Sequence, residues 1–178
     1  LKTSHGSEST GVIPFMKVVD AEMLAFSQGV TRRGSYAAYL DISHPEIEEF
    51  LDVRKPTGGD INRKSINLHH AIIIPDAFME LIDKATKEEG FNDDWDLIDP
   101  HSGEVKKTVS AKTLWVKLIQ NRVETGEPYI MFGDAVNRKL PEFQKQLGLK
   151  VNQSNLCSEI TLPTNDDRTA VCCLSSVN

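Results

Sequence analysis

The sequence predicts an α/β fold, in which strands and helices alternate within one domain. Segments whose apolar residues recur at helical spacing alternate along the 178 residues with short runs of Ile, Leu, Val and Tyr that are typical of strands. Breaks containing glycine or proline separate these segments, and no internal repeat, low-complexity tract or linker interrupts them. A chain of this length can bury the core of a single domain.

The first third of the chain predicts a helix, a break, a strand and a second, short helix. The first helix is expected over residues 12–26, where apolar side chains recur near helical spacing. These side chains are Phe15, Val18, Val19 and Met23. Residues 27–34 interrupt the helix with two glycines and two adjacent arginines, and residues 36–42 form a short apolar strand. Ser43 and Glu46 have the spacing of a capping box, which predicts that a short helix begins there.

The middle of the chain predicts a turn, a strand and an amphipathic helix. Residues 56–60 carry the Pro-Thr-Gly-Gly-Asp sequence of a turn, and residues 66–74 are rich in Ile and Leu, as in a strand. The helix begins at Asp76 and ends at Gly90. Its apolar face is Phe78, Leu81, Ile82 and Ala85.

The remaining segments continue this alternation. Residues 95–98 and 104–109 predict a hairpin, and residues 112–124 give the clearest helical pattern. The buried stripe of that helix is expected to be Leu114, Trp115, Leu118, Ile119 and Val123. A strand is predicted over residues 129–132 and a short helix over residues 140–147. Two final strands are predicted from Leu156 to Leu162 and from Ala170 to Ser175, joined by a polar loop.

The bulk properties exclude several classes of function. The net charge of -6 and the pI of about 5.4 argue against nucleic acid or an anionic membrane surface as the main partner. No apolar run reaches the roughly 18 residues of a membrane span, so none is expected. The first residues lack both a Met and the apolar stretch of a signal peptide, which suggests an internal cut.

The three cysteines indicate functional thiols in a cytoplasmic protein rather than a secreted disulfide framework. Their number is odd, and all of them, Cys157, Cys172 and Cys173, lie near one end of the chain. Cys172 and Cys173 are adjacent, so in a strand they would point to opposite faces. Only one of the two could then share a site with Cys157.

The most specific motif is Asn155, Cys157 and Glu159, at alternate positions around the start of the strand predicted from Leu156. In an extended strand these three side chains would point to one face. An amide, a thiol and a carboxylate suit radical chemistry on a sugar. The thiol can become a thiyl radical that abstracts a hydrogen atom from carbon. The carboxylate can take a proton from a hydroxyl that the amide holds in place.

The surrounding sequence resembles the large (alpha) subunit of class I ribonucleotide reductase. Residues 153–160, Gln-Ser-Asn-Leu-Cys-Ser-Glu-Ile, resemble the active-site strand of that family. Further similar blocks occur in the family's order and together cover essentially the whole chain. They are residues 10–15, 27–34, 44–51, 74–79, 126–130 and 172–178. The resemblance implies that residues 1–178 are part of a ten-stranded α/β catalytic barrel, with the Cys157 strand leading into its centre.

The resemblance also implies a role for each residue of the motif. Cys157 becomes the thiyl radical that removes the 3′ hydrogen of a ribonucleotide. Glu159 is the base for the 3′ hydroxyl, which helps the 2′ hydroxyl leave as water, and Asn155 holds the sugar hydroxyls. Cys172 supplies one reducing equivalent, since its spacing matches the family better than that of Cys173. Read without the resemblance, each of these thiols could equally be a structural core residue.

The resemblance assigns an effector-specificity loop to Ser27, Gln28, Arg32 and Arg33. In the family, this loop links a bound deoxynucleotide effector to the base of the substrate, and dNTP or ATP act as allosteric effectors. An arginine side chain offers several donors in one plane, which suits bases and phosphates. Val30 occupies a position where the family often has a second glycine, so the loop is expected to be stiffer.

The implied partners follow from the same resemblance. The substrate is a ribonucleoside diphosphate, the radical comes from a separate metal-containing small (beta) subunit, and the electrons come from thioredoxin or glutaredoxin. The complete large subunit is expected to be a homodimer, and the rest of it would supply the second redox cysteine and the phosphate-binding segments. The chain alone is therefore expected to be inactive and to expose sheet edges. No cofactor is expected to bind directly, and His69, His70 and His101 lack the ligand spacing of a metal site.

Two alternatives remain open from the sequence. An adenosylcobalamin-dependent relative uses the same Asn-x-Cys-x-Glu motif, although Leu156 and the upstream blocks favour class I. A different class of function is a non-catalytic piece of a split or degenerate reductase that serves assembly or nucleotide binding. Intact Asn155, Cys157, Glu159 and Cys172 argue against degeneration.

Overall fold

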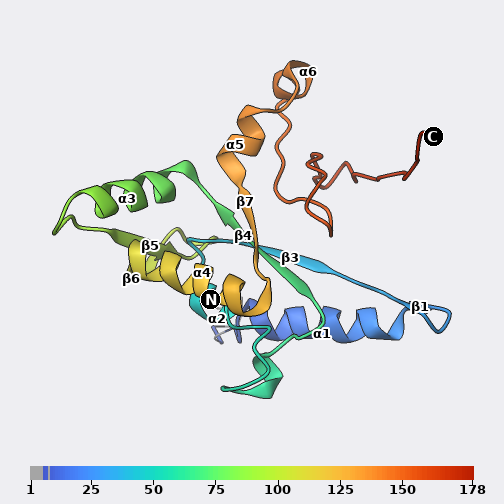
Figure 1. Ribbon diagram of the computed structural model, residues 1–178, viewed down its shortest axis with the longest axis horizontal. Coiled ribbons are helices and arrows are strands. Elements are labelled where there is room, and N and C mark those ends of the chain that lie inside the picture. The colour runs from blue at the N-terminus through green and yellow to red at the C-terminus, as the bar shows by residue number, and fades with distance from the viewer. Residues whose placement is uncertain (1–5, 8) are drawn as a thin grey trace.

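The computed structural model describes residues 6, 7 and 9–178, apart from the side chains of Ser27 and Gln28. Its centre is a parallel sheet of three strands in the order β3, β4, β7 (Figure 1). The strands are β3 (Ala37–Asp41), β4 (His69–Ile74) and β7 (Tyr129–Phe132). The sheet keeps the order of the strands along the chain, as in a barrel wall, and within the described residues it does not close. The predicted α/β class is confirmed.

Each connection between these strands passes through helices, because parallel neighbours cannot be joined by a tight turn. The first connection contains α2 (Ile47–Phe50) and the 3-10 helix η1 (Ile61–Arg63). The second contains α3 (Asp76–Lys87), the antiparallel hairpin of β5 (Asp94–Ile98) and β6 (Val105–Ser110), and α4 (Ala111–Thr125). The predictions for α3, the hairpin, α4 and β7 are confirmed, whereas the strand predicted from residue 66 begins only at His69.

Helices cover one face of the sheet, and the main apolar core lies between them and the strands. Ile72 and Ile74 of β4 are fully buried there with Phe50 of α2, Phe78 of α3 and Leu118 of α4. Each side chain of this size contributes roughly 1.5–3 kcal/mol through its removal from water. This core therefore fixes the helices against a single face of the sheet.

The opposite face of the sheet carries a different set of side chains. Tyr39, Ala71 and Tyr129 are register partners and form one row across the three strands. Next to this row Met131 is buried in a small second core, against which Tyr39 packs. The other buried members of this core are Leu140 and Val151. The helices of the main apolar core do not cover this face, so this face can receive another segment of the chain.

The first helix, α1 (Val12–Ala25), matches its prediction in extent but differs in its buried side. Ile13 and Asp20 are its buried residues, whereas Phe15 and Val18 are exposed. The predicted break after it forms a small hairpin of β1 (Ser27–Gln28) and β2 (Arg32–Arg33), at the far end of α1 in Figure 1. Gly34 follows this hairpin, where a Cβ atom would lie 2.7 Å from the carbonyl oxygen of Met23.

The predicted capping box of Ser43 and Glu46 is wrong. The backbone N–H of Glu46 donates to Nδ1 of His44, and the Glu46 carboxylate accepts from the N–H of Val12 at 2.6 Å. Glu46 therefore caps α1, which lies far from it in sequence, instead of its own helix. Arg63 donates to Glu46 at 3.2 Å and binds Glu49 through two hydrogen bonds, which ties α1 to α2 and η1.

The buried stripe of α4 also differs from the predicted one. Leu114 and Leu118 are buried as expected, but Val123 is exposed. Asn121 takes an inner position instead, because its amide donates to the carbonyl oxygen of Leu51 at 2.9 Å. After β7 the chain forms α5 (Gly133–Arg138), which was not predicted, and α6 (Glu142–Gln146), inside the predicted helix 140–147. No helix among the described residues is long and apolar enough to cross a membrane.

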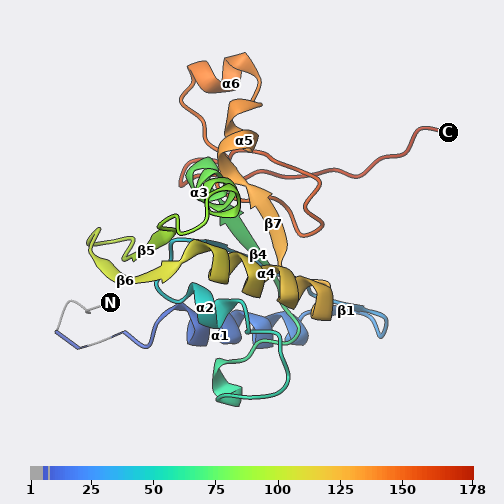
Figure 2. The ribbon, with the colours of Figure 1, turned by 60° about the vertical axis from the view of Figure 1, so that its left-hand side comes forward.

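The two final strands predicted over residues 156–162 and 170–175 are wrong. After α6 the chain returns toward β7 and then runs as an irregular trace to its end (Figure 2). A strand needs a neighbour to accept and donate its ladder hydrogen bonds. Within the described chain, no strand pairs with this segment, and its hydrogen bonds are local or go to side chains.

A buried carboxylate joins the starts of β4 and β7. Glu127 is 7% exposed and accepts from Nδ1 of His69 at 2.6 Å, Nδ1 of His70 at 3.2 Å and Arg54 at 2.9 Å. It also accepts from the backbone N–H of His70 at 3.2 Å. Burial alone would raise the pKa of Glu127, but these hydrogen bonds and the charge of Arg54 outweigh it and hold the pKa at about 2.

We expect Glu127→Gln to destabilise the protein that carries this chain by about 1–3 kcal/mol, because it removes a charged acceptor and leaves buried donors unpaired. Glu124→Gln is the matched control, since Glu124 is largely exposed and its ion pair within the described residues is with Lys55. Thermal unfolding followed by circular dichroism at neutral pH measures both. Equal midpoints for the two variants would contradict the assigned role of Glu127.

The same site predicts a pH dependence. The pKa of Glu127 is lower in the folded chain than its ordinary value of 4.5, so its stabilising contribution is complete above that value. It is lost as the pH falls from 4.5 toward 2. The difference in unfolding midpoint between the wild type and Glu127→Gln should therefore narrow across this window. A difference that stays constant down to pH 2.5 would show that the carboxylate charge is not the cause.

Candidate active site

The residues of the central motif lie in a closed loop, residues 155–160. The N–H of Asn155 donates to the carbonyl oxygen of Ile160 at 3.2 Å, and the N–H of Ile160 donates to Oδ1 of Asn155 at 2.9 Å. Ser154 adds a hydrogen bond from its hydroxyl to the Ile160 carbonyl at 2.6 Å. Inside the loop, the N–H of Ser158 donates to the carbonyl oxygen of Asn155 at 3.1 Å. Cys157 therefore lies in a tight turn between two anchored residues.

This loop corrects the prediction that Asn155, Cys157 and Glu159 share one face of a strand. Cys157 and Glu159 are exposed, while Asn155 is half-buried and uses its side-chain oxygen to close the loop. Ser158 has a φ of 64°, and it is the one described residue other than glycine with a positive φ. The strict alternation of an extended strand breaks at that residue. The predicted strand conformation of the three groups is therefore wrong, and they lie along a loop instead.

The loop rests on the face of the sheet that carries the Tyr39–Ala71–Tyr129 row. The hydroxyl of Tyr39 lies 3.1 Å from the carbonyl oxygen of Asn155 and 3.1 Å from Oγ of Ser158. Tyr129 lies nearby. Burial raises the pKa of Tyr129, and the charge of Glu127 raises it further. Cys157 therefore lies close to this face, which the helices of the main core leave open and which is called the open face below.

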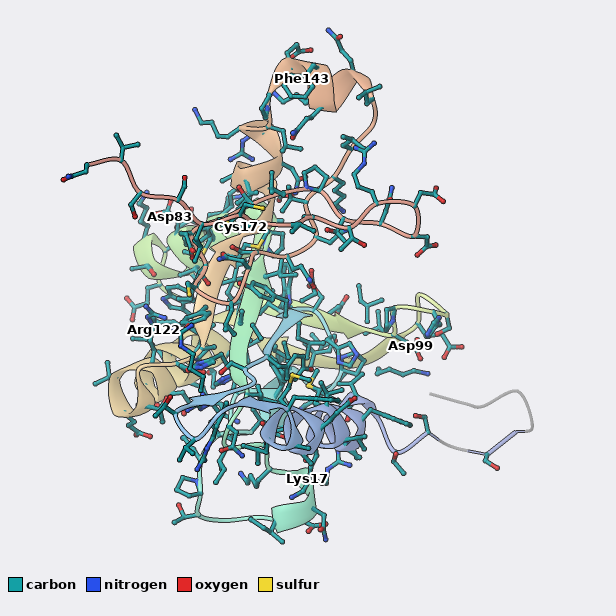
Figure 3. All side chains as sticks on the ribbon, turned by 90° about the vertical axis from the view of Figure 1, so that its right-hand side faces the viewer. Lys17, Asp83, Asp99, Arg122, Phe143 and Cys172 are labelled. Carbon is teal, nitrogen blue, oxygen red and sulfur yellow. The ribbon has the colours of Figure 1, made fainter. Side chains whose placement is uncertain are left out.

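Cys172 lies beside Asn155 rather than beside Cys157. Both Asn155 and Cys172 line a cleft together with Gln153, Ser154 and Val171, and Cys157 is not among its lining residues. Figure 3 labels Cys172 on the C-terminal segment. Cys157, Cys172 and Cys173 are all exposed free thiols. The structure therefore brings Cys172 to one side of the loop and leaves Cys157 at its turn.

The predicted effector residues lie in the hairpin after α1. The backbone of Ser27 pairs with Arg33, and that of Gln28 with Arg32. The side chains of Ser27 and Gln28 lie outside what the structure describes, and both arginine side chains are exposed. Val30 is fully exposed in the turn. The hairpin thus presents two guanidinium groups to its surroundings.

Three further positions take part in this site, and the sequence pattern does not mark them. The sequence predicts Tyr39 and Tyr129 only as strand residues, although each places a hydroxyl beside the apolar side chains of its strand. That contrast is the signal that could have marked them. Ser158 gave no signal, because its positive φ follows from the loop it closes. His69 and His70 pair with Glu127, and the described residues contain no group of three or more His, Cys, Asp and Glu that could hold a metal ion.

Comparison with known proteins gives one consistent family. The family model described as "Ribonucleotide reductase, barrel domain" matches residues 2–178. A frog virus 3 protein named as a candidate ribonucleoside-diphosphate reductase large subunit is 54% identical over 172 residues, which is 97% of this chain and 29% of that protein. A protein of Invertebrate iridescent virus 3 that is named as a ribonucleoside-diphosphate reductase large subunit is 45% identical over 218 residues. The match covers 96% of this chain and 34% of that protein.

A solved structure agrees with these relatives. The class Id ribonucleotide reductase alpha subunit of Actinobacillus ureae matches with a TM-score of 0.70 and 29% identity, covering 96% of this chain and 26% of that one. The chain thus spans about a third or less of the length of these proteins.

The loop geometry predicts that two substitutions of Asn155 will differ. Asn155→Asp keeps the oxygen that accepts from Ile160, whereas Asn155→Ala removes it. We expect hydrogen exchange of the Ile160 amide, in the protein that carries this chain, to be about 5- to 10-fold faster in Asn155→Ala and nearly unchanged in Asn155→Asp, because one hydrogen bond contributes about 1 kcal/mol. Mass spectrometry of peptides spanning residues 153–162 measures this. Equal exchange in both variants would show that the side chain does not close the loop.

Proposed function

The chain belongs to the ribonucleotide reductase family through its barrel domain, and from that premise we propose that it forms part of the catalytic barrel of a ribonucleoside-diphosphate reductase large subunit. The reaction would reduce ribonucleotides to 2′-deoxyribonucleotides for DNA synthesis. The observation that carries the proposal is the closed loop of residues 155–160, which holds Cys157 over the open face of a parallel sheet. The names of the relatives support the same reaction.

In this proposal Cys157 starts the chemistry. Its S–H bond gives up a hydrogen atom to the radical that the metal-containing small subunit supplies, and the resulting thiyl radical takes the 3′ hydrogen atom of the ribose. This step depends on the position of the thiol and not on its thiolate form, because the S–H bond is the reacting group. The hydrogen-bonded turn on both sides of Cys157 supplies such a position. Other parts of the large subunit would cover the loop and exclude water.

Three other residues complete the proposed mechanism. Glu159, two residues after the thiol, accepts the proton of the 3′ hydroxyl. The 2′ hydroxyl takes a proton from one of the two redox thiols, Cys172 or its partner outside this chain, and leaves as water. Asn155 keeps its amide N–H₂ group free to bind a sugar hydroxyl, because only its Oδ1 atom closes the loop. Cys172 reaches the same side of the loop as Asn155. There it would give a reducing equivalent and form a disulfide with a cysteine outside this chain, which thioredoxin or glutaredoxin would reduce again.

The hairpin after α1 provides the proposed regulatory contact. Its exposed Arg32 and Arg33 would bind a dNTP or ATP effector together with Ser27 and Gln28, since guanidinium groups pair with phosphates and stack on bases. The complete large subunit would act as a homodimer with the small subunit, in the cytoplasm and without a membrane partner.

Cys157→Ser in the complete large subunit tests the proposal. With the small subunit and a thioredoxin system present, we expect turnover to fall to background, at least 10³-fold, because a serine O–H bond is too strong to form the radical. Substrate and effector binding, measured by calorimetry, should stay within about 2-fold. Cys173→Ser is the matched control and should keep turnover. Deoxynucleotide formation by Cys157→Ser would contradict the assignment.

A further inference from the structure

We propose that Tyr39 is a positioning residue for Cys157, which deepens the proposed function and rests on it. Tyr39 lies on β3, more than a hundred residues before the loop, and its hydroxyl contacts the loop on both sides of the thiol. The geometry assigns it the task of fixing where the turn of residues 155–158 lies over the sheet. Tyr39 itself is not assigned a contact with substrate.

The direction of the two hydrogen bonds follows from simple proton counting. A carbonyl oxygen can only accept, so at 3.1 Å the Tyr39 O–H must donate to the carbonyl of Asn155. A phenol has one proton, and Tyr39 has therefore none left for Ser158. The Ser158 hydroxyl consequently donates to the Tyr39 oxygen, also at 3.1 Å. One phenol thus bridges the residues two before and one after Cys157.

The backbone of Ser158 shows why this bridge matters. A φ of 64° costs a non-glycine residue roughly 1 kcal/mol and persists only where the surroundings hold it. Two interactions hold it here: its N–H bonds to Asn155, and its hydroxyl bonds to Tyr39. Loss of the Tyr39 oxygen leaves only the first. The turn could then relax, and the Cys157 side chain would move with it.

The ring of Tyr39 is itself fixed, which makes it a suitable anchor. It packs against the second core of Met131, Leu140 and Val151. Its register partner is Ala71, whose small side chain separates Tyr39 from Tyr129 in the same row. A side chain on a paired strand is held more precisely than one on a loop. Tyr39 therefore attaches to the rigid sheet a turn that has no strand partner of its own.

The consequence is an effect on the chemical step and not on binding. A displacement of about 1 Å between reacting atoms can cost about 100-fold in rate. Tyr39→Phe removes only the oxygen and keeps the ring in its apolar contacts. In the complete enzyme with its small subunit, we expect kcat to fall roughly 10- to 100-fold, with KM and effector binding within about 2-fold. Tyr36→Phe is the control, since Tyr36 precedes β3 and is partly buried in the main core rather than against the loop.

Two further readouts separate positioning from damage to the fold. With substrate deuterated at the 3′ carbon, Tyr39→Phe should show a larger isotope effect on kcat than the wild type, because hydrogen abstraction becomes more rate-limiting. Hydrogen exchange of the Ser158 and Ile160 amides should also be faster, and this readout does not depend on catalysis. Ser158→Ala should cause a smaller loss, and its combination with Tyr39→Phe should be less than additive, since both remove the same hydrogen bond.

Unchanged kcat and unchanged amide exchange in Tyr39→Phe would overturn the inference. A second result would also overturn the inference: kcat falls, the amount of substrate bound falls equally, and the isotope effect is unchanged. That result would show only that a smaller fraction of the variant is folded. If Cys157→Ser is inactive while Tyr39→Phe behaves as the wild type, the inference alone fails. If Cys157→Ser remains active, the proposed function fails, whatever the result at Tyr39.

Discussion

The pairing of three parallel strands is the constraint on which the rest of this structure depends. Parallel neighbours force each connection to return over the sheet, and here the helices of both connections pack on the same face, around Phe50, Phe78 and Leu118. The opposite face is left with the Tyr39–Ala71–Tyr129 row and a small second core. That face is the one on which the Cys157 loop lies. The fold thus separates a helix-covered side that provides stability from an open side that receives the site.

The positions of the chemical groups follow from this separation. Glu127 joins the starts of β4 and β7 through His69, His70 and Arg54, which fixes the spacing of two strands beneath the row. Tyr39 then joins the third strand to the loop. The loop has no ladder of its own, so its geometry comes from side chains: Asn155 closes it, and Tyr39 and Ser158 attach it to the sheet. The proposed radical chemistry requires such a fixed position, because a thiyl radical abstracts hydrogen only from an atom held beside it.

The sequence predicted the elements whose formation is local or driven by burial. The helices α1, α3 and α4 and the hairpin of β5 and β6 follow from apolar spacing and turn residues, and the structure has each of them. The buried side of α1 could not be predicted, since Ile13 is buried by segments distant in sequence while Phe15 stays exposed. The capping role of Glu46 failed for a similar reason: its carboxylate serves the N–H of Val12, 34 residues away. The alternation of Asn155, Cys157 and Glu159 predicted a strand, which is the wrong conformation because no neighbouring strand among the described residues pairs with this segment.

The most direct test of this account is the structure of the complete large subunit that carries this chain, with a ribonucleoside diphosphate bound. The account predicts that the ribose lies between the loop of residues 155–160 and the other parts of the subunit, with its C3′ atom about 3–3.5 Å from the sulfur of Cys157. Tyr39 should still bridge Asn155 and Ser158 beneath it. A ribose bound away from this loop, or a Cys157 side chain directed into the helix-covered face of the sheet, would contradict the account.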